Sequence, residues 1–118
     1  MSLQALPLSE EQLTARKLRA IADVIEVEPH RWTQHAIARD TLGNPVTVIS
    51  SDAMCWCTSG WILRTGIRAA GRNATVKAFR TAMGGAFNIP IWNDAAKRTA
   101  GDVVTMFRAT ATILESIK

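Results

Sequence analysis

The 118-residue sequence lacks several features that would narrow its function at once. No stretch approaches the roughly 20 apolar residues of a membrane span, and no basic region followed by an apolar run opens the chain. Its two cysteines are too few for the disulfide framework of a small secreted protein, so we expect reduced thiols. These absences favour a cytoplasmic protein of the bacterial type.

Phosphate-loop and zinc-site spacings are also missing. Gly84-Gly85 stands alone and does not extend into a glycine-rich nucleotide-binding loop. On a helix, Cys55 and Cys57 would point about 200° apart, and the two histidines lie in a different segment, so no standard zinc spacing exists. We therefore expect no metal site and no cofactor.

Negative charge is missing from the middle of the chain. No Asp or Glu occurs between Asp52 and Asp94, and the formal net charge of the whole chain is +4. The cations in this stretch are Arg64, Arg68, Arg72, Lys77 and Arg80. Because the three arginines nearest Asp52 recur every fourth residue, one continuous helix would align them in a stripe. This charge pattern favours an anionic partner.

The composition predicts one ordinary globular domain. Hydrophobic residues make up 47% of the chain and charged residues 20%, values typical of soluble proteins. A chain of this length buries most of the surface that its unfolded form exposes. We assign residues 1–8 to a short leader and residues 9–118 to a single globular domain.

The first helix is predicted from its start signal and its apolar stripe. Ser9 to Gln12 has the pattern of a capping box. Leu18, Ile21, Ala22 and Ile25 then recur with the spacing of one helix face, and Pro29 stops the helix. At the other end of the chain, Thr99 to Asp102 predicts a second capping box and a final helix to about Ile117.

Between these helices the pattern predicts a hairpin and two further helices. Residues 32–38 and the β-branched residues 45–49 form the two arms, joined by a turn over 40–43. Residues 50–52 then cap a largely apolar central helix over 53–70 that Gly71 ends, and Asn73 caps a third helix that Gly84-Gly85 ends. Residues 87–92 are expected to be extended. The fold class is therefore α+β and mostly α, with about four helices packed around a short β-hairpin.

Helical phase gives the leading candidate for a binding surface. On the predicted central helix, Cys57, Trp61, Arg64 and Arg68 lie within about 60° of one another. An indole beside guanidinium groups either forms a cation–π surface for an acidic ligand or fills the core while the arginines reach solvent. The other tryptophans, Trp32, Trp56 and Trp92, are interpreted as core residues.

A second constellation contains the residue types of nucleophilic catalysis. Cys57 is the candidate nucleophile, His35 the base, and Asn93 or Asp94 the residue that orients the imidazole. A thiol in the middle of a helix lacks the N-terminal dipole that lowers a cysteine pKa, which argues against this reading. For Asn93 and Asp94, capping of the turn before the last helix is the preferred interpretation.

Several segments resemble a family of small bacterial proteins known only as a domain of unknown function. The resemblance is carried by Trp32 with Gln34, Ala38-Arg39-Asp40, Gly43-x-Pro45-Val46, Trp56-Cys57-x-x-Gly60, Trp92-Asn93-Asp94 and Arg98-Thr99-Ala100. It implies a shared fold but no activity, substrate or cofactor. Cys55 and Trp61 depart from the family pattern, and the bulky ring after Gly60 suggests an exposed contact point.

Two hypotheses from different functional classes follow. The leading one is a non-enzymatic module that binds a protein or an acidic ligand through Trp61, the three arginines, Lys77 and Arg80, with self-association through Trp61 as a variant. The rival is a small hydrolase or transferase that uses Cys57 and His35. Nucleic acid is a weaker partner because neither a helix-turn-helix nor an aromatic platform is predicted, and no membrane partner is expected.

Overall fold

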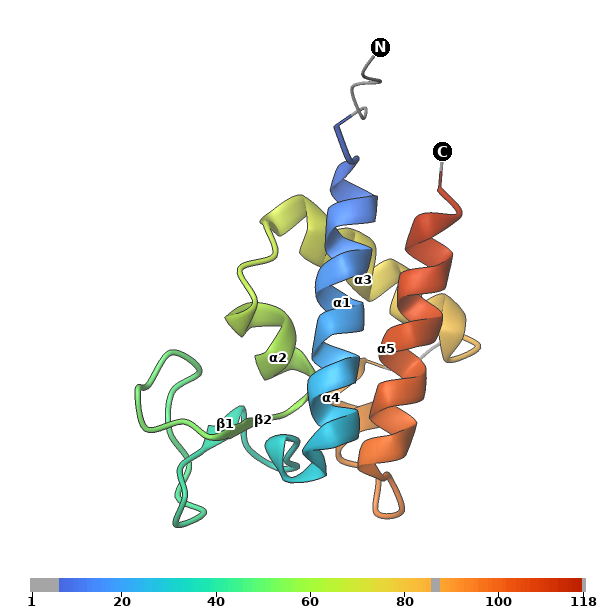
Figure 1. Ribbon diagram of the computed structural model, residues 1–118. Helices are drawn as coiled ribbons and strands as arrows, with labels where there is room; N and C mark the ends of the chain where they lie inside the picture. The colour runs from blue at the N-terminus through green and yellow to red at the C-terminus, as the bar shows by residue number, and fades with distance from the viewer. Residues whose placement is uncertain (1–6, 86–87, 118) are drawn as a thin grey trace.

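Two long helices form the front of the molecule, and a third crosses behind them. The computed structural model describes residues 7–85 and 88–117. Helices α1 (Glu10–Val27) and α5 (Ala100–Glu115) run antiparallel and side by side, and α3 (Ala69–Ala82) crosses behind both (Figure 1). Helix α2 (Thr58–Arg64) flanks α1, and a small two-stranded sheet lies beyond it.

The starts of α1 and α5 confirm both predicted capping boxes. The Ser9 Oγ accepts a hydrogen bond from Gln12 N at 3.1 Å, and the Gln12 side chain accepts one from Ser9 N at 2.9 Å. Thr99 and Asp102 exchange the same pair of bonds at 3.1 and 3.0 Å. Each box satisfies backbone donors that the first helical turn leaves free, which fixes where the helix begins.

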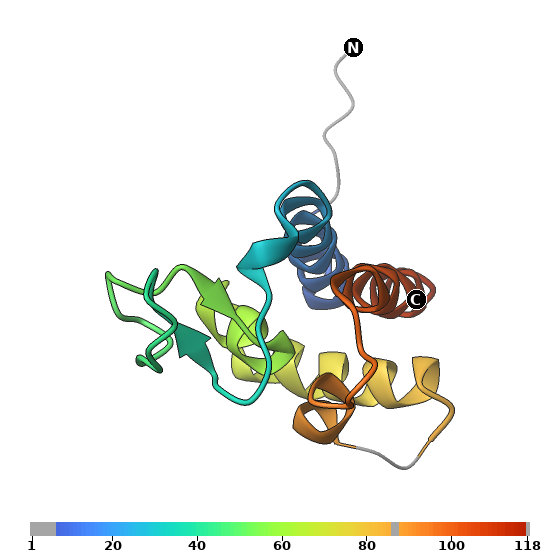
Figure 2. The same ribbon diagram turned by 90° about the horizontal axis from the view of Figure 1, so that it is seen from below.

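The core lies where α1, α3 and α5 meet. The predicted stripe on α1 is buried, and the fully enclosed large side chains against it come from α3 and α5. They include Phe79, Phe107, Val103 and Leu114. Figure 2 shows this arrangement from below, where α3 runs along one side of the pair formed by α1 and α5. No helix within the described ranges is long and apolar enough to cross a membrane.

The predicted turn is present, but the strand that follows it is elsewhere. Gly43 has a φ of +84°, and its N–H donates to Asp40 O at 3.0 Å, which confirms the turn. Strand β1 (Ala38–Arg39) pairs antiparallel with β2 (Cys55–Trp56), so the prediction of a second arm over 45–49 is wrong. From the predicted arm, Pro45 forms an isolated bridge to Arg39, and Val46 N donates to Ala38 O at 3.0 Å.

The continuous central helix over 53–70 is also wrong. Its first residues form β2, and the helical part covers only α2 before Gly66, with a φ of +73°, turns the chain into α3. Gly71 and Asn73, predicted as a stop and a cap, both lie inside α3. The end at Gly84-Gly85 is confirmed by φ angles of +80° and +132°. Strand pairing with β1, which is nonlocal, overrides the apolar pattern of this segment.

The segment around Pro90 is helical rather than extended. Asn88 caps the short helix α4 (Ile89–Asn93) by accepting a hydrogen bond from Ile91 N at 2.8 Å. Pro90 lies in the first turn, where its missing N–H costs no helical bond. Phe87, predicted as part of the extended segment, lies outside the described residues. The fold class is confirmed: helices dominate, and a single antiparallel strand pair completes the structure.

Candidate functional site

Trp61 is a core residue, so the prediction that it is exposed beside the arginines is wrong. Only 5% of Trp61 is exposed, and its Nε1–H donates to Arg31 O at 3.0 Å. The single stripe is wrong as well, because Arg68 caps α3 and is no longer in helical phase with Arg64 on α2. The break at Gly66 separates them.

Arg64 nevertheless makes the cation–π contact that sequence reasoning considered. Its guanidinium carbon lies 4.2 Å from the ring centroid of Trp56 and 5.7 Å from that of Trp61. The two rings are themselves 4.8 Å apart and tilted by 58°. The buried rings of Trp56 and Trp61 therefore pack beneath the exposed Arg64 and do not themselves form a contact surface.

The five predicted cations lie in chain order along α2 and α3. Arg64 ends α2, Arg68 begins α3, and the other three project from α3. We call this set, Arg64, Arg68, Arg72, Lys77 and Arg80, the α2–α3 basic surface. All but Arg72 are exposed, and Arg72 is partly buried, with its Nη1 donating to Ile67 O at 2.7 Å.

Among the described residues, the five cations of the α2–α3 basic surface form no ion pair, in contrast to four of the six other arginines, although Glu10 and Arg68 line one hollow. Arg19, Arg31, Arg98 and Arg108 each have a carboxylate within 4.0 Å. Within the described ranges, none of the five cations of the surface has one. The acids cluster instead on α1 and α5, where Arg108 bridges Asp23 at 3.0 Å and Glu26 at 2.7 Å.

The residues proposed for catalysis lie close together in space, although they are far apart in the sequence. Cys57, Asn93 and Asp94 line one cavity of about 260 Å³, with Ile37 and Pro90 among its apolar walls. His35 reaches Asp94 from the loop after Trp32, and its Nδ1 lies 3.8 Å from Asp94 Oδ2. Three separate segments therefore meet at this cavity.

Cys57 is the N-cap of α2, so its placement in the middle of a helix was wrong. Its Sγ accepts a hydrogen bond from Gly60 N at 3.3 Å. Burial raises the pKa of the Cys57 thiol above its ordinary value, the Gly60 N–H opposes that rise, and the Asp94 carboxylate adds to it. No hydrogen bond joins Cys57 to His35 in the part of the chain that the structure describes. The thiol is thus kept protonated near neutral pH.

Asn93 is the buried hub that holds this region together. Its Oδ1 accepts hydrogen bonds from Trp32 Nε1 at 2.7 Å, Thr58 N at 2.9 Å and Thr58 Oγ1 at 2.7 Å. Its Nδ2 donates to Thr33 O at 3.1 Å and to Asp94 Oδ1 at 3.0 Å. With every polar atom of the fully buried side chain used, the amide orients the cavity walls and has no group left for a substrate.

Asp94 lines the cavity and is held by His35. His35 has a φ of +64°, rare for a residue with a side chain, and its N–H donates to Asp94 Oδ1 at 2.9 Å. Burial raises the pKa of Asp94, but hydrogen bonds from His35 N and the Asn93 amide outweigh it and leave the pKa below its ordinary value. Asp94 is also the C-cap residue of α4, so the prediction of a turn role holds beside the cavity role.

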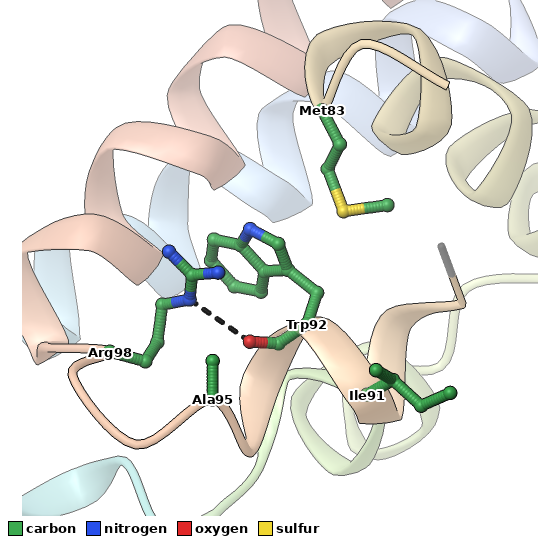
Figure 3. Close-up of a pocket in the computed structure, with 5 residues that line it drawn as sticks. All are labelled: Met83, Ile91, Trp92, Ala95 and Arg98. Carbon is green, nitrogen blue, oxygen red and sulfur yellow. Dashed lines mark hydrogen bonds between the residues drawn. The ribbon is translucent and has the colours of Figure 1, made fainter. Parts of the chain in front are cut away.

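Arg98 was absent from the residues predicted to form a site, although it borders another cavity. This cavity, about 320 Å³, is lined by Met83, Ile91, Trp92, Ala95 and Arg98 (Figure 3). The guanidinium lies 4.0 Å from the Trp92 ring centroid, and Nε donates to Trp92 O at 2.9 Å. A turn separates Trp92 from Arg98, so helical periodicity could not have predicted their contact. The short distance between them in the sequence was the only indication of it.

Comparison with known proteins gives a single match. The model of a family of unknown function, DUF6197, matches residues 9–113. No curated protein matches the chain, and no solved structure does. Within the described ranges, no three His, Cys, Asp or Glu side chains are grouped so that they could hold a metal ion.

Proposed function

The chain belongs to DUF6197, a family of unknown function, and we propose that it is a non-enzymatic module that docks an acidic protein partner through the α2–α3 basic surface. The observation that carries this proposal is the segregation of charge. Five cations lie along α2 and α3 without a carboxylate within 4.0 Å among the described residues, while Asp23, Glu26 and Glu115 pair with arginines between α1 and α5. Such a surface attracts anions over several ångströms and speeds their association.

Arg64 is the best-ordered contact of the proposed surface. Its guanidinium rests on the Trp56 ring, so less side-chain freedom is lost when it meets a carboxylate. Trp61 contributes to binding only as the second ring beneath Arg64. Trp61 therefore needs no exposed surface for this role.

An acidic protein segment fits this surface better than a nucleic acid. Proteins that bind single strands stack bases on open aromatic rings. Here Trp56 is 2% exposed and Trp61 5% exposed, so neither ring face is open to a base. Arginine and lysine side chains spaced along a helix instead suit the carboxylates of an acidic peptide.

The experiment measures binding of a fluorescent poly-glutamate peptide by anisotropy. Lys77→Glu on α3 should weaken binding about fivefold at low salt, because it removes one attraction and adds one repulsion. Lys97→Glu makes the same chemical change in the loop before α5 and should leave affinity unchanged. Affinity should also fall as salt rises.

Three results would refute the proposal. Wild-type protein that does not bind the peptide at low salt is one, and equal losses in the two lysine variants are another. The third is an oligonucleotide that binds more tightly than the peptide at the same ionic strength, which would make nucleic acid the partner.

The cysteine-dependent hydrolase or transferase is favoured by one observation: Cys57 and Asp94 line a single cavity, and His35 contacts Asp94. It requires a thiolate at neutral pH. The raised pKa of Cys57 predicts the opposite, so in a Cys55→Ser background iodoacetamide should react slowly at pH 7 and faster as the pH rises. Fast alkylation at pH 7 that Asp94→Asn or His35→Gln abolishes would establish the enzyme hypothesis instead.

A further inference from the structure

Helix α1 carries a second apolar stripe on the side away from the core. Leu13, Val24 and Val27 are 43%, 39% and 79% exposed, and Ala20 lies exposed among them. At about 100° per residue, these four positions fall within roughly 60° of one another, opposite the buried Leu18 and Ile25. A surface helix that packs by one face needs only one apolar stripe, so the second has no role inside the fold.

Among the described elements, the stripe is covered only along one edge, where α2 and the α2–α3 turn flank it. Helix α1 lies at the front of the molecule in Figure 1, with α3 behind it, and Figure 2 shows α1 at the edge of the helical layers. On one flank, the half-exposed Leu63 of α2 extends the apolar area. A hollow of about 240 Å³ between α1 and α2 is lined by Ala20, Val24 and Trp61, together with Lys17, Ile21 and Thr65.

The charges beside the stripe are arranged to complement a second copy. Arg16 and Asp23 lie on the same flank, nearly equal distances before and after Ala20. Arg16 has no carboxylate within 4.0 Å among the described residues. Asp23 contacts Arg108 at 3.0 Å but is 71% exposed, which leaves room for a second cation. In an antiparallel pair, flanks of the same side face each other, so Arg16 would meet the partner's Asp23.

We propose that two copies of this chain associate through the outer stripe of α1, antiparallel and about a two-fold axis near Ala20. Leu13 then packs against the partner's Val27, and the small side chain of Ala20 lets the helices approach closely at the axis. A parallel pair would instead set the flank of Arg16 and Asp23 against the opposite flank of the partner, so these two residues would not meet. Charge complementarity therefore selects the antiparallel arrangement.

This association goes beyond the proposed function and is independent of it. Helix α3 lies behind α1 in Figure 1, so pairing through the outer stripe of α1 leaves the α3 part of the α2–α3 basic surface open, although Arg68 shares a hollow with Leu13 at the edge of the stripe. A dimer would present two basic surfaces to an acidic partner and raise its apparent affinity. Because one helix supplies most of the contact, the interface is small, and we expect a weak, concentration-dependent dimer.

The test places like or opposite charges at the proposed axis. In Ala20→Glu, two carboxylates meet across the two-fold axis, and in Ala20→Lys two ammonium groups meet, so each variant alone should be monomeric. An equimolar mixture of the two should recover a dimer, because each carboxylate then faces an ammonium group. Sedimentation velocity measures the fraction of dimer directly. Protein concentrations from about 10 to 500 µM suit a weak dimer.

The control variant is Thr105→Glu, at an exposed position of α5 outside the stripe, which should dimerise like the wild type. Circular dichroism establishes that all variants fold, since Glu and Lys are good helix formers. The proposal is overturned if the wild type stays monomeric throughout this range. It is equally overturned if Ala20→Glu still dimerises, if the mixture stays monomeric, or if Thr105→Glu dissociates.

Discussion

Asn93 shows how much of this fold depends on a single side chain. Its carbonyl oxygen accepts hydrogen bonds from Trp32 and from two donors of Thr58, which joins the loop after α1, the start of α2 and the end of α4. All of these donors are buried or partly buried, so removing the acceptor leaves them without partners. Asn93 is therefore a structural residue, although sequence reasoning treated it as a catalytic or capping one.

Asn93→Ala should lower the free energy of unfolding by about 3 kcal/mol or more, since each buried donor left unsatisfied costs about 1–3 kcal/mol. Urea denaturation monitored by circular dichroism measures the change. Asn73→Ala is the matched control: Asn73 is exposed inside α3, so its loss should be neutral or stabilising by a few tenths of a kcal/mol. Similar losses in both variants would contradict the assignment of Asn93 as a hub.

At the scale of elements, the sequence predicted what local chemistry determines. The capping boxes at Ser9 and Thr99 and the glycine end at Gly84 depend on residues a few positions apart, and all three are present. Strand β2 and the late start of α2 were missed because their causes are distant in sequence: β2 pairs with β1, and Asn93 holds Thr58. The break between α2 and α3 has a local signal, Gly66 with a φ of +73°, which the apolar pattern outweighed in the prediction. The meeting of Cys57 with Asp94 was proposed only from residue types, since no spacing encodes it.

Gly71 illustrates this limit and provides a prediction. It is buried in α3 against α1, and an added Cβ would lie 2.6 Å from Thr14 Oγ1 and 2.8 Å from Ile67 Cγ2. Gly71→Ala should therefore destabilise the protein by about 1–3 kcal/mol, because the neighbouring side chains must shift. Thermal unfolding monitored at 222 nm measures the change.

Gly101→Ala is the control for that substitution. An added Cβ there meets only Thr99 Oγ1 at 3.7 Å, so the gain in helix propensity should stabilise α5 by about 0.5–1 kcal/mol. The two Gly→Ala changes should consequently have opposite signs. Stabilisation by both would show that α1 and α3 do not approach as closely as the structure indicates.

At the scale of the whole molecule, charge is divided between two sides. Arg19 and Arg108 hold α1 to α5 through Glu115, Asp23 and Glu26, and these pairs keep the pKa of Glu26 and Glu115 below their ordinary values. The cations of the α2–α3 basic surface have no such partners among the described residues. The acids that would neutralise them are therefore expected on another molecule.

Titration of isotope-labelled protein with a poly-glutamate peptide, followed by nuclear magnetic resonance, tests this central claim most directly. The account predicts that amide shifts concentrate on α3 and at the α2–α3 turn, and that the indole N–H of Trp61 stays protected from solvent because it donates to Arg31 O. Raising the salt concentration should reverse the shifts. Shifts centred on Cys57, His35 and Asp94, or no shifts at low salt, would contradict it.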